Sequence, residues 1–324
     1  MPLDAPAEWG EALSRVRHAF AHTWENCYAM HLTTGFKTYL YCFEAENLRV
    51  VCPLAERKFQ GYIDIVTPYG FSGFVGDGDC SGFRQRFTDF VKKQGYVCGY
   101  IALNPILENT TCLAHWETFQ HNSIYVLDLT LGYNELYANL STNRKRQLRD
   151  RAEIVSHTVS ERDGLINFFL TNYSEFFRAK HASSVYHFSE NTLSYLLNLN
   201  NVFLVGARGP EGVEAVSVFA YTPYVGDFLF NVSLPRGRHH SAALLWHGLT
   251  RLKALKVPLL NLGGGISEND GVARFKQRFG GKRLALRCLK QVYQPEVYVE
   301  LCRRANVDDT NMAGYFPAYR SLSS

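Results

Sequence analysis

One lysine in the second half of the chain has neighbours that suit a catalytic cation. The segment from about Asn269 to Phe279 predicts a helix, and three of its apolar residues are expected to face inward: Val272, Phe275 and Phe279. Lys276 would then lie at the edge of that face, where an ammonium can stabilise the negative charge that develops on a carbonyl under attack. The alternative is an ordinary solvated cation, as expected for the arginines beside it.

A dense basic run precedes the middle of the chain. It contains Arg144, Lys145, Arg146, Arg149 and Arg151, interrupted by polar and apolar residues. On a helix these cations spread around several faces. Arg144 and Arg146 are candidates for contacts with a substrate, including the phosphates of a nucleotide or a tRNA, and such contacts would be sensitive to salt. A solvated connecting helix is the alternative.

A third basic group lies just before a helix predicted from about His240 to Leu255. Arg236, Arg238 and Ser241 are candidates for binding a phosphate there, because a helix N-terminus presents free N–H groups and Ser241 can cap it. The alternative is a basic turn.

Two further residues are candidates for binding a substrate. Asn231, on the preceding strand, can reach a carbonyl or hydroxyl, and Tyr69, in a turn after Pro68, can stack on an acceptor. The alternatives are a structural asparagine and a rigid hairpin.

Other chemistries lack their signatures. There is no CxxC pair, HExxH or paired-carboxylate motif, and Gly263-Gly264-Gly265 matches neither a dinucleotide-binding nor a Walker A sequence. We therefore expect neither metal nor bound cofactor. The net charge of +4 permits a polyanionic partner but does not argue for DNA.

The location of the protein is expected to be cytoplasmic. The eight cysteines show no metal spacing and are expected to be free thiols in a reducing compartment. Residues 1–10 do not resemble a signal peptide, and no run of 18 apolar residues predicts a membrane span.

The expected secondary structure is mixed α/β. In the second half we predict, in order, a strand, two helices, three antiparallel strands, a helix, a strand, a helix, a strand and a final helix: 152–160, 163–179, a helix from Ser189, 202–208, 214–221, 227–233, 240–255, 258–262, 269–279, 283–293 and 295–305. In the first half we predict strands at 36–44, 48–53, 62–67, 97–103 and 124–129 and helices at 81–94 and 104–113, with a bridging helix at 133–151.

This order predicts two tandem domains, residues 1–131 and 132–324. Both would have mixed, largely antiparallel sheets with helices on both faces, and a cleft between them would bind ligands.

Three stretches resemble the FemABX family of aminoacyl-tRNA-dependent transferases. They are Thr67-Pro68-Tyr69-Gly70-Phe71-Ser72-Gly73, the basic helix that begins Leu140-Ser141-Thr142-Asn143-Arg144, and Leu260-Asn261-Leu262-Gly263-Gly264-Gly265 followed by the Phe275-Lys276 helix. The resemblance implies two tandem GNAT-like domains and a lysine, Lys276 here, that stabilises the oxyanion. The glycine-rich pyrophosphate loop of GNAT enzymes is degenerate at 235–242, which weakens coenzyme A as donor.

The resemblance implies transfer of an amino acid from aminoacyl-tRNA to an amine of a peptidoglycan precursor or a small molecule, with formation of an amide bond. Two alternatives stay open: an acyl-CoA-dependent N-acyltransferase on the same fold, and a non-catalytic binding relative.

Overall fold

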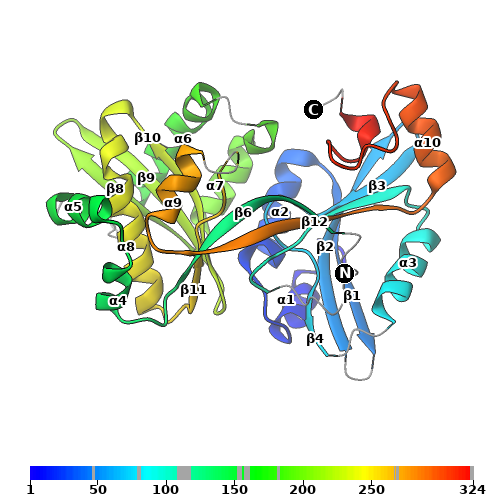
Figure 1. Ribbon diagram of the computed structural model, residues 1–324, viewed down its shortest axis with the longest axis horizontal. Coiled ribbons are helices and arrows are strands. Elements are labelled where there is room, and N and C mark those ends of the chain that lie inside the picture. The colour runs from blue at the N-terminus through cyan, green and yellow to red at the C-terminus, as the bar shows by residue number, and fades with distance from the viewer. Residues whose placement is uncertain are drawn as a thin grey trace. The chain divides into compact units, whose positions relative to one another are not determined.

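The protein is described from a computed structural model that covers residues 1–45, 48–78, 82–107, 118–151, 155–156, 161–180, 183–265, 267 and 270–321. The chain forms two compact units (Figure 1). Unit 1 consists of residues 1–121 and 285–324, and unit 2 of residues 122–284.

Unit 1 has a mixed sheet in the order β1-β2-β3-β5-β12. Its strands are β1 (Lys37–Ala45), β2 (Leu48–Phe59), β3 (Tyr62–Val66), β5 (Cys98–Ala102) and β12 (Lys282–Val292), and β4 (Val75–Asp77) pairs with β2. The first three are antiparallel, β3 and β5 are parallel, and β5 pairs antiparallel with β12 through Cys288–Val292.

Helices cover both faces of this sheet. Alternation along β1 sends Leu40 toward α1 (Pro6–Ser14) and α2 (Trp24–Thr34), and sends Tyr41 toward α3 (Phe83–Lys93). The C-terminal segment, with α10 (Pro295–Arg304) and a 3-10 turn (Ala318–Arg320), packs on the same unit. A buried carboxylate anchors it, because Asp64 accepts hydrogen bonds from Arg57 (2.6 Å), Arg320 (2.7 Å) and Tyr319 (3.1 Å).

Unit 2 repeats this arrangement. Its sheet has the order β6-β11-β10-β9-β8-β7, formed by β6 (Thr118–Asp128), β7 (Val155–Ser156), β8 (Val202–Gly209), β9 (Gly212–Tyr221), β10 (Gly226–Ser233) and β11 (Leu259–Asn261). β8, β9 and β10 are antiparallel, β10 and β11 are parallel, and β11 pairs antiparallel with β6. The predicted antiparallel run of three strands is confirmed.

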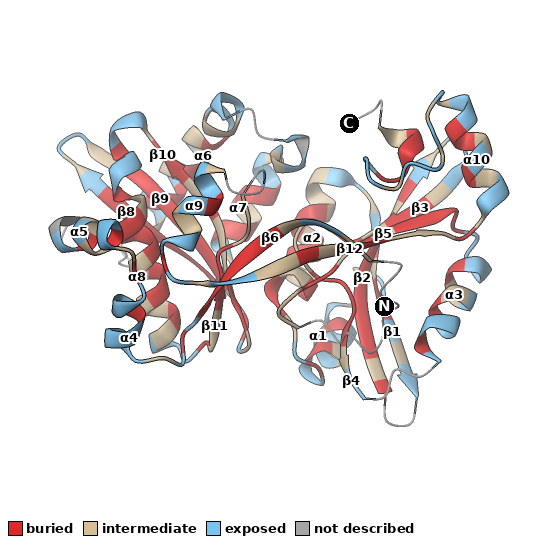
Figure 2. Cartoon of the chain, in the orientation of Figure 1, coloured by how far each residue is buried: buried red, intermediate tan, exposed pale blue. Residues whose placement is uncertain are grey.

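The helices of unit 2 also lie on both faces of its sheet. Phe203 and Phe219 face α8 (Ser241–Ala254), whereas Phe230 faces α6 (Arg162–Ala179). α7 (Glu190–Asn198) begins at Ser189, whose hydroxyl accepts from the Thr192 N–H as a predicted cap. α4 (Tyr133–Ala138), α5 (Thr142–Arg151) and α9 (Gly271–Gln277) complete the unit, and buried residues concentrate on the strands and the helix faces that cover them (Figure 2).

The two units are not divided by a single boundary at residue 131, as the sequence predicts. β6 follows β5 in sequence yet pairs with β11 in unit 2, and β12 follows α9 yet pairs with β5 in unit 1. The two equivalent sheets thus exchange their last strands. For this reason residues 285–324 belong to unit 1 and not to the second domain.

Three local expectations differ from the structure. The helix predicted at 133–151 is two helices. The Ser141 N–H donates to the Arg278 carbonyl (3.0 Å), and the Ser141 hydroxyl accepts from the Arg144 N–H at the start of α5. Val272, predicted to face inward, is exposed, and Ala273 is buried in its place. Residues 104–107 form a turn instead of a helix, and the rest of that prediction lies outside the described residues, as does most of the strand predicted at 152–160. The sequence reasoning also missed α1 and α2.

Candidate functional site

Lys276 projects from α9 toward the glycine segment that follows β11. Asp270 begins the helix, since its carboxylate accepts hydrogen bonds from the Ala273 N–H (2.7 Å) and the Ser267 N–H (3.2 Å). One turn later, Lys276 Nζ donates to the carbonyl oxygen of Gly264 at 2.6 Å. The side chain is only partly exposed, so Lys276 is not the freely solvated cation of the alternative interpretation.

The environment of this ammonium makes it easier to deprotonate. Burial lowers the pKa of Lys276 from 10.5 to about 8, and the nearby Asp270 carboxylate opposes the change. A base with this pKa is roughly 90% protonated at pH 7. The group is therefore a cation at neutral pH. Within the described part of the chain it donates a hydrogen bond to a single carbonyl, and it has less water around it than a surface lysine has.

Gly263 and Gly264 must be glycine for the segment after β11 to present this carbonyl. A Cβ on Gly264 would lie 2.5 Å from the Ser123 carbonyl oxygen, and Gly263 has a positive φ of 70°. Asn122 holds the far side of this segment, donating to the Gly265 carbonyl at 2.9 Å. A tight turn at these glycines stays a prediction, because Leu262 and Gly263 still pair with Tyr125 and residue 266 lies outside the described residues.

The lysine lies where the parallel pair of the sheet ends. β10 and β11 pair only at Gly226–Leu260 and Asp227–Asn261. Beyond this point the chain after β11 continues to pair with Tyr125 of β6, while β10 has a bulge between Phe228 and Phe230. In open α/β sheets, ligands bind outside the carboxyl ends of parallel strands, and the Lys276 ammonium occupies that position in unit 2.

Asn261 ties the two strands together just below the lysine. Its side-chain nitrogen donates to the Asp227 carboxylate at 2.9 Å, and its side-chain oxygen Oδ1 accepts from the Gly263 N–H at 2.8 Å. The side chain is buried, so these bonds fix where the strands separate. The sequence reasoning passed over both Asn261 and the cap Asp270, although an Asp directly before an apolar-periodic segment is a start signal for a helix.

Arg144 does not face solvent as the prediction of a substrate-binding residue requires. It is 5% exposed, and its guanidinium lies 4.2 Å from the centre of the Phe275 ring and 5.3 Å from that of Phe279. Burial, with the charge of Arg278, lowers the pKa of Arg144 to about 10. The planar guanidinium stacks on the Phe275 and Phe279 rings, which leave it little exposed surface.

Other cations of α5 and α9 remain at the surface. Arg146 is exposed and donates to Asn143 at 3.3 Å, and Arg274 and Arg278 are exposed one turn apart on α9. Phe275, a predicted substrate contact, is half-buried, and its ring contacts the Arg144 guanidinium. The Ser141–Arg278 hydrogen bond keeps the two helices adjacent, so the exposed arginines of α5 lie near those at the C-terminal end of α9.

One of the two arginines predicted to bind phosphate before α8 is paired with carboxylates. Arg236 pairs with Glu211 (2.5 Å) and with the buried Glu214 (3.0 Å), so its charge is already neutralised. The prediction that Ser241 caps the helix is wrong, because its hydroxyl donates to the Arg238 carbonyl (3.0 Å) instead of accepting from a helix N–H. Arg238 is exposed.

The last two candidates have structural partners. Asn231 accepts a hydrogen bond from Ser217 at 2.9 Å on the neighbouring strand. Tyr69 belongs to unit 1, where its carbonyl accepts from Asn26 and Gly70 packs against Ala21. Lys276 and Phe275 thus come together in unit 2 with Arg144, and a substrate role for Tyr69 or Asn231 stays a prediction.

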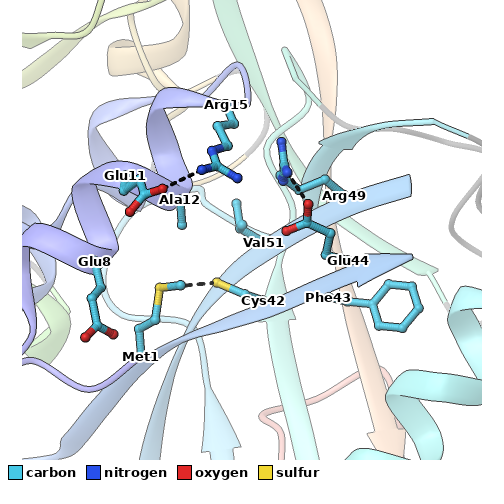
Figure 3. Close-up of a pocket in the computed structure, with 10 residues that line it drawn as sticks. All are labelled: Met1, Glu8, Glu11, Ala12, Arg15, Cys42, Phe43, Glu44, Arg49 and Val51. Carbon is cyan, nitrogen blue, oxygen red and sulfur yellow. Dashed lines mark hydrogen bonds and ion pairs between the residues drawn. The ribbon is translucent and has the colours of Figure 1, made fainter. Parts of the chain in front are cut away.

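Unit 1 contains a pocket of its own. It is formed by α1, β1 and β2, and Figure 3 shows that its two arginines are already paired, Arg15 with Glu11 and Arg49 with Glu44. None of the predicted site residues lines it.

Across the described ranges, no three His, Cys, Asp or Glu side chains converge to hold a metal ion, and no helix has the length and apolar character to cross a membrane.

Comparison with solved structures gives the fold. The crystal structure of FemX matches 86% of this chain and 92% of its own, with a TM-score of 0.64 at 10% identity. The chain has the fold of FemX. This confirms the predicted mixed α/β class, while the low identity leaves the chemistry open.

Two other structures share the FemX fold with this chain. The C-terminal domain of a putative lysylphosphatidylglycerol synthetase from Agrobacterium fabrum has a TM-score of 0.59 at 14% identity, covering 88% of this chain and 92% of its own. L-PGS from Bacillus licheniformis has a TM-score of 0.57 at 13% identity, covering 92% and 96%. No protein-family model and no curated protein sequence matches this chain.

Proposed function

We propose that this chain is an acyltransferase that moves an aminoacyl group from aminoacyl-tRNA to an amine, on a peptidoglycan precursor or a small molecule. The observation that carries the proposal is the Lys276 ammonium at the carboxyl end of β11, partly desolvated and aimed at a backbone carbonyl. The FemX-like fold and the family resemblance of the Phe275-Lys276 helix support it.

Lys276 would act on the tetrahedral intermediate. When the acceptor amine attacks the donor ester carbonyl, negative charge develops on the carbonyl oxygen, and a cation nearby stabilises this charge more strongly when water is partly excluded. The Gly264 carbonyl holds the ammonium before the reaction, so little reorganisation is needed. The bond between the carbonyl carbon and the ribose oxygen of the tRNA then breaks, and an amide bond replaces the ester. The ribose oxygen leaves as a hydroxyl with the proton that the amine releases.

The charges around the site favour tRNA over coenzyme A as donor. Arg146, Arg274 and Arg278 are exposed on the adjacent helices α5 and α9, where they can contact phosphates. By contrast, Glu211 and Glu214 already occupy Arg236, which an acyl-CoA pyrophosphate would need at the start of α8.

The test compares donors directly. The purified protein is incubated with tRNA charged with labelled amino acids and with peptidoglycan precursors or amines, and label in new amide bonds is measured with and without prior RNase treatment. We expect RNase-sensitive transfer by the wild type, a loss of about 100-fold or more in Lys276→Met, and no rise in Tm with acetyl-CoA. Transfer from acetyl-CoA, or wild-type rates in folded Lys276→Met, would contradict the proposal.

A further inference from the structure

Arg144 is a buried cation that makes no ion pair with a carboxylate in the described ranges of the chain. It donates hydrogen bonds to the Gln147 side chain and, at 3.5 Å, to the Phe275 carbonyl, and its Nε atom is buried without a hydrogen-bond partner among the described residues. Burying an arginine in this way is costly, and a leucine or methionine would fill the same space at a lower cost. The residue type therefore needs an explanation beyond packing.

Helix α9, which Arg144 contacts, is too short to hold its own orientation. α9 has only seven residues, fewer than a helix needs to be stable by itself. Its N-terminus is held by the Asp270 cap, and its C-terminal end is held by α5, through the stack of Arg144 on Phe275 and the Ser141–Arg278 hydrogen bond.

Lys276 lies within the part of α9 that is held from both ends. It follows Phe275 directly, and its ammonium reaches the Gly264 carbonyl while the Phe275 and Phe279 rings contact the guanidinium. A small rotation of so short a helix would move the long lysine side chain away from this carbonyl. Loss of the stack on one side of α9 should therefore change the setting of the lysine on the other.

We propose that Arg144 is a positioning residue, which clamps α9 through its stack on Phe275 and thereby fixes the Lys276 ammonium against the Gly264 carbonyl. The proposal concerns the same site as the proposed function, whose chemistry gives the clamp its purpose. It assigns no substrate contact to Arg144.

The test measures the Lys276 amine itself and needs no substrate. The folded protein is labelled briefly with acetic anhydride at a series of pH values, and peptide mass spectrometry gives the titration midpoint of each lysine. In the wild type we expect a midpoint of about 8 for Lys276. In Arg144→Met we expect it to rise by about one unit or more, because a loosened helix exposes the amine to water. Asp270, the charged group that acts on this amine, is unchanged in the variant.

A matched control exists in the same unit. Arg251 on α8 is half-buried, with its guanidinium 4.4 Å from the centre of the Phe203 ring. Arg251→Met removes an arginine–phenylalanine contact at nearly the same distance, and it should leave the Lys276 midpoint unchanged. An equal shift in both variants would reduce the effect to general loosening and overturn the clamp.

Two more variants separate the stack from the charge. Arg144→Lys keeps a cation without the planar group, and Phe275→Leu removes the ring from the other side, so both should raise the midpoint as Arg144→Met does. Phe275→Leu also serves if Arg144→Met does not fold. A wild-type midpoint in the folded variants would overturn the proposal, whereas full transferase activity in Lys276→Met would contradict the proposed function alone. Where transfer is measured, Arg144→Met should lower kcat with little change in KM.

Discussion

Lys276→Met should make the protein more stable at neutral pH while it abolishes most of the activity. The pKa of this lysine is about 8 in the folded protein and near 10.5 without burial, so below pH 8 the folded state carries an ammonium that it disfavours. Each pH unit between the two values is worth about 1.4 kcal/mol, which gives a penalty of roughly 3 kcal/mol at pH 7. Loss of the hydrogen bond to Gly264 returns about 1 kcal/mol, so the net gain is ~1–2 kcal/mol.

The sign of this effect depends on pH. As the pH rises from 8 to 10.5, the wild-type lysine becomes neutral in the folded state first, and its penalty disappears. The stability of the variant relative to the wild type should therefore fall over this range, to zero or slightly below, because the neutral amine still donates to the Gly264 carbonyl.

Denaturant unfolding of both proteins at pH 7, 8, 9 and 10 measures this difference, in which the titration of other groups cancels. Lys282→Met, at an exposed lysine, is the control and should show no pH-dependent difference from the wild type. A Lys276→Met protein that is less stable than the wild type at pH 7, with a difference that does not vary with pH, would refute the reasoning from desolvation.

Three further predictions concern the surroundings of this lysine and the anchor of unit 1. Asp270→Ala should lower the free energy of unfolding by about 1 kcal/mol through loss of the α9 cap; it should also lower the pKa of Lys276 further, so that the rate of transfer declines at a lower pH than in the wild type. Gly264→Ala should reduce both Tm and turnover, because its Cβ would meet the Ser123 carbonyl and displace the segment after β11. Gly271→Ala is the control and should change neither, because a Cβ there meets open space. Equal effects of the two variants would count against the steric argument. Asp64→Asn in unit 1 should lower the free energy of unfolding by roughly 3 kcal/mol, since Arg57 and Arg320 lose their shared carboxylate. Denaturant unfolding measures this loss, and a loss below about 1 kcal/mol would show that the C-terminal segment does not depend on the Asp64 carboxylate.

The order of helices and strands was determined locally, and the sequence therefore predicted most of it. Apolar periodicity and glycine-rich turns specify the strands of unit 2, and Ser189 caps α7 as its residue type indicates. Residue type alone did not distinguish Lys276 from Arg274 and Arg278 beside it; the resemblance of the Phe275-Lys276 helix to the FemABX family singled it out.

Only the tertiary structure decided which strands pair and what each cation contacts. The exchange of β6 and β12 between the two sheets leaves no local trace, because each strand has the same alternating pattern whichever sheet it joins. In the same way, Arg144, Arg146 and Arg236 look alike in sequence, yet one is stacked beneath α9, one is exposed and one is neutralised by glutamates. The charge of a residue is encoded in its type, whereas its solvation and its partners depend on segments distant in the chain.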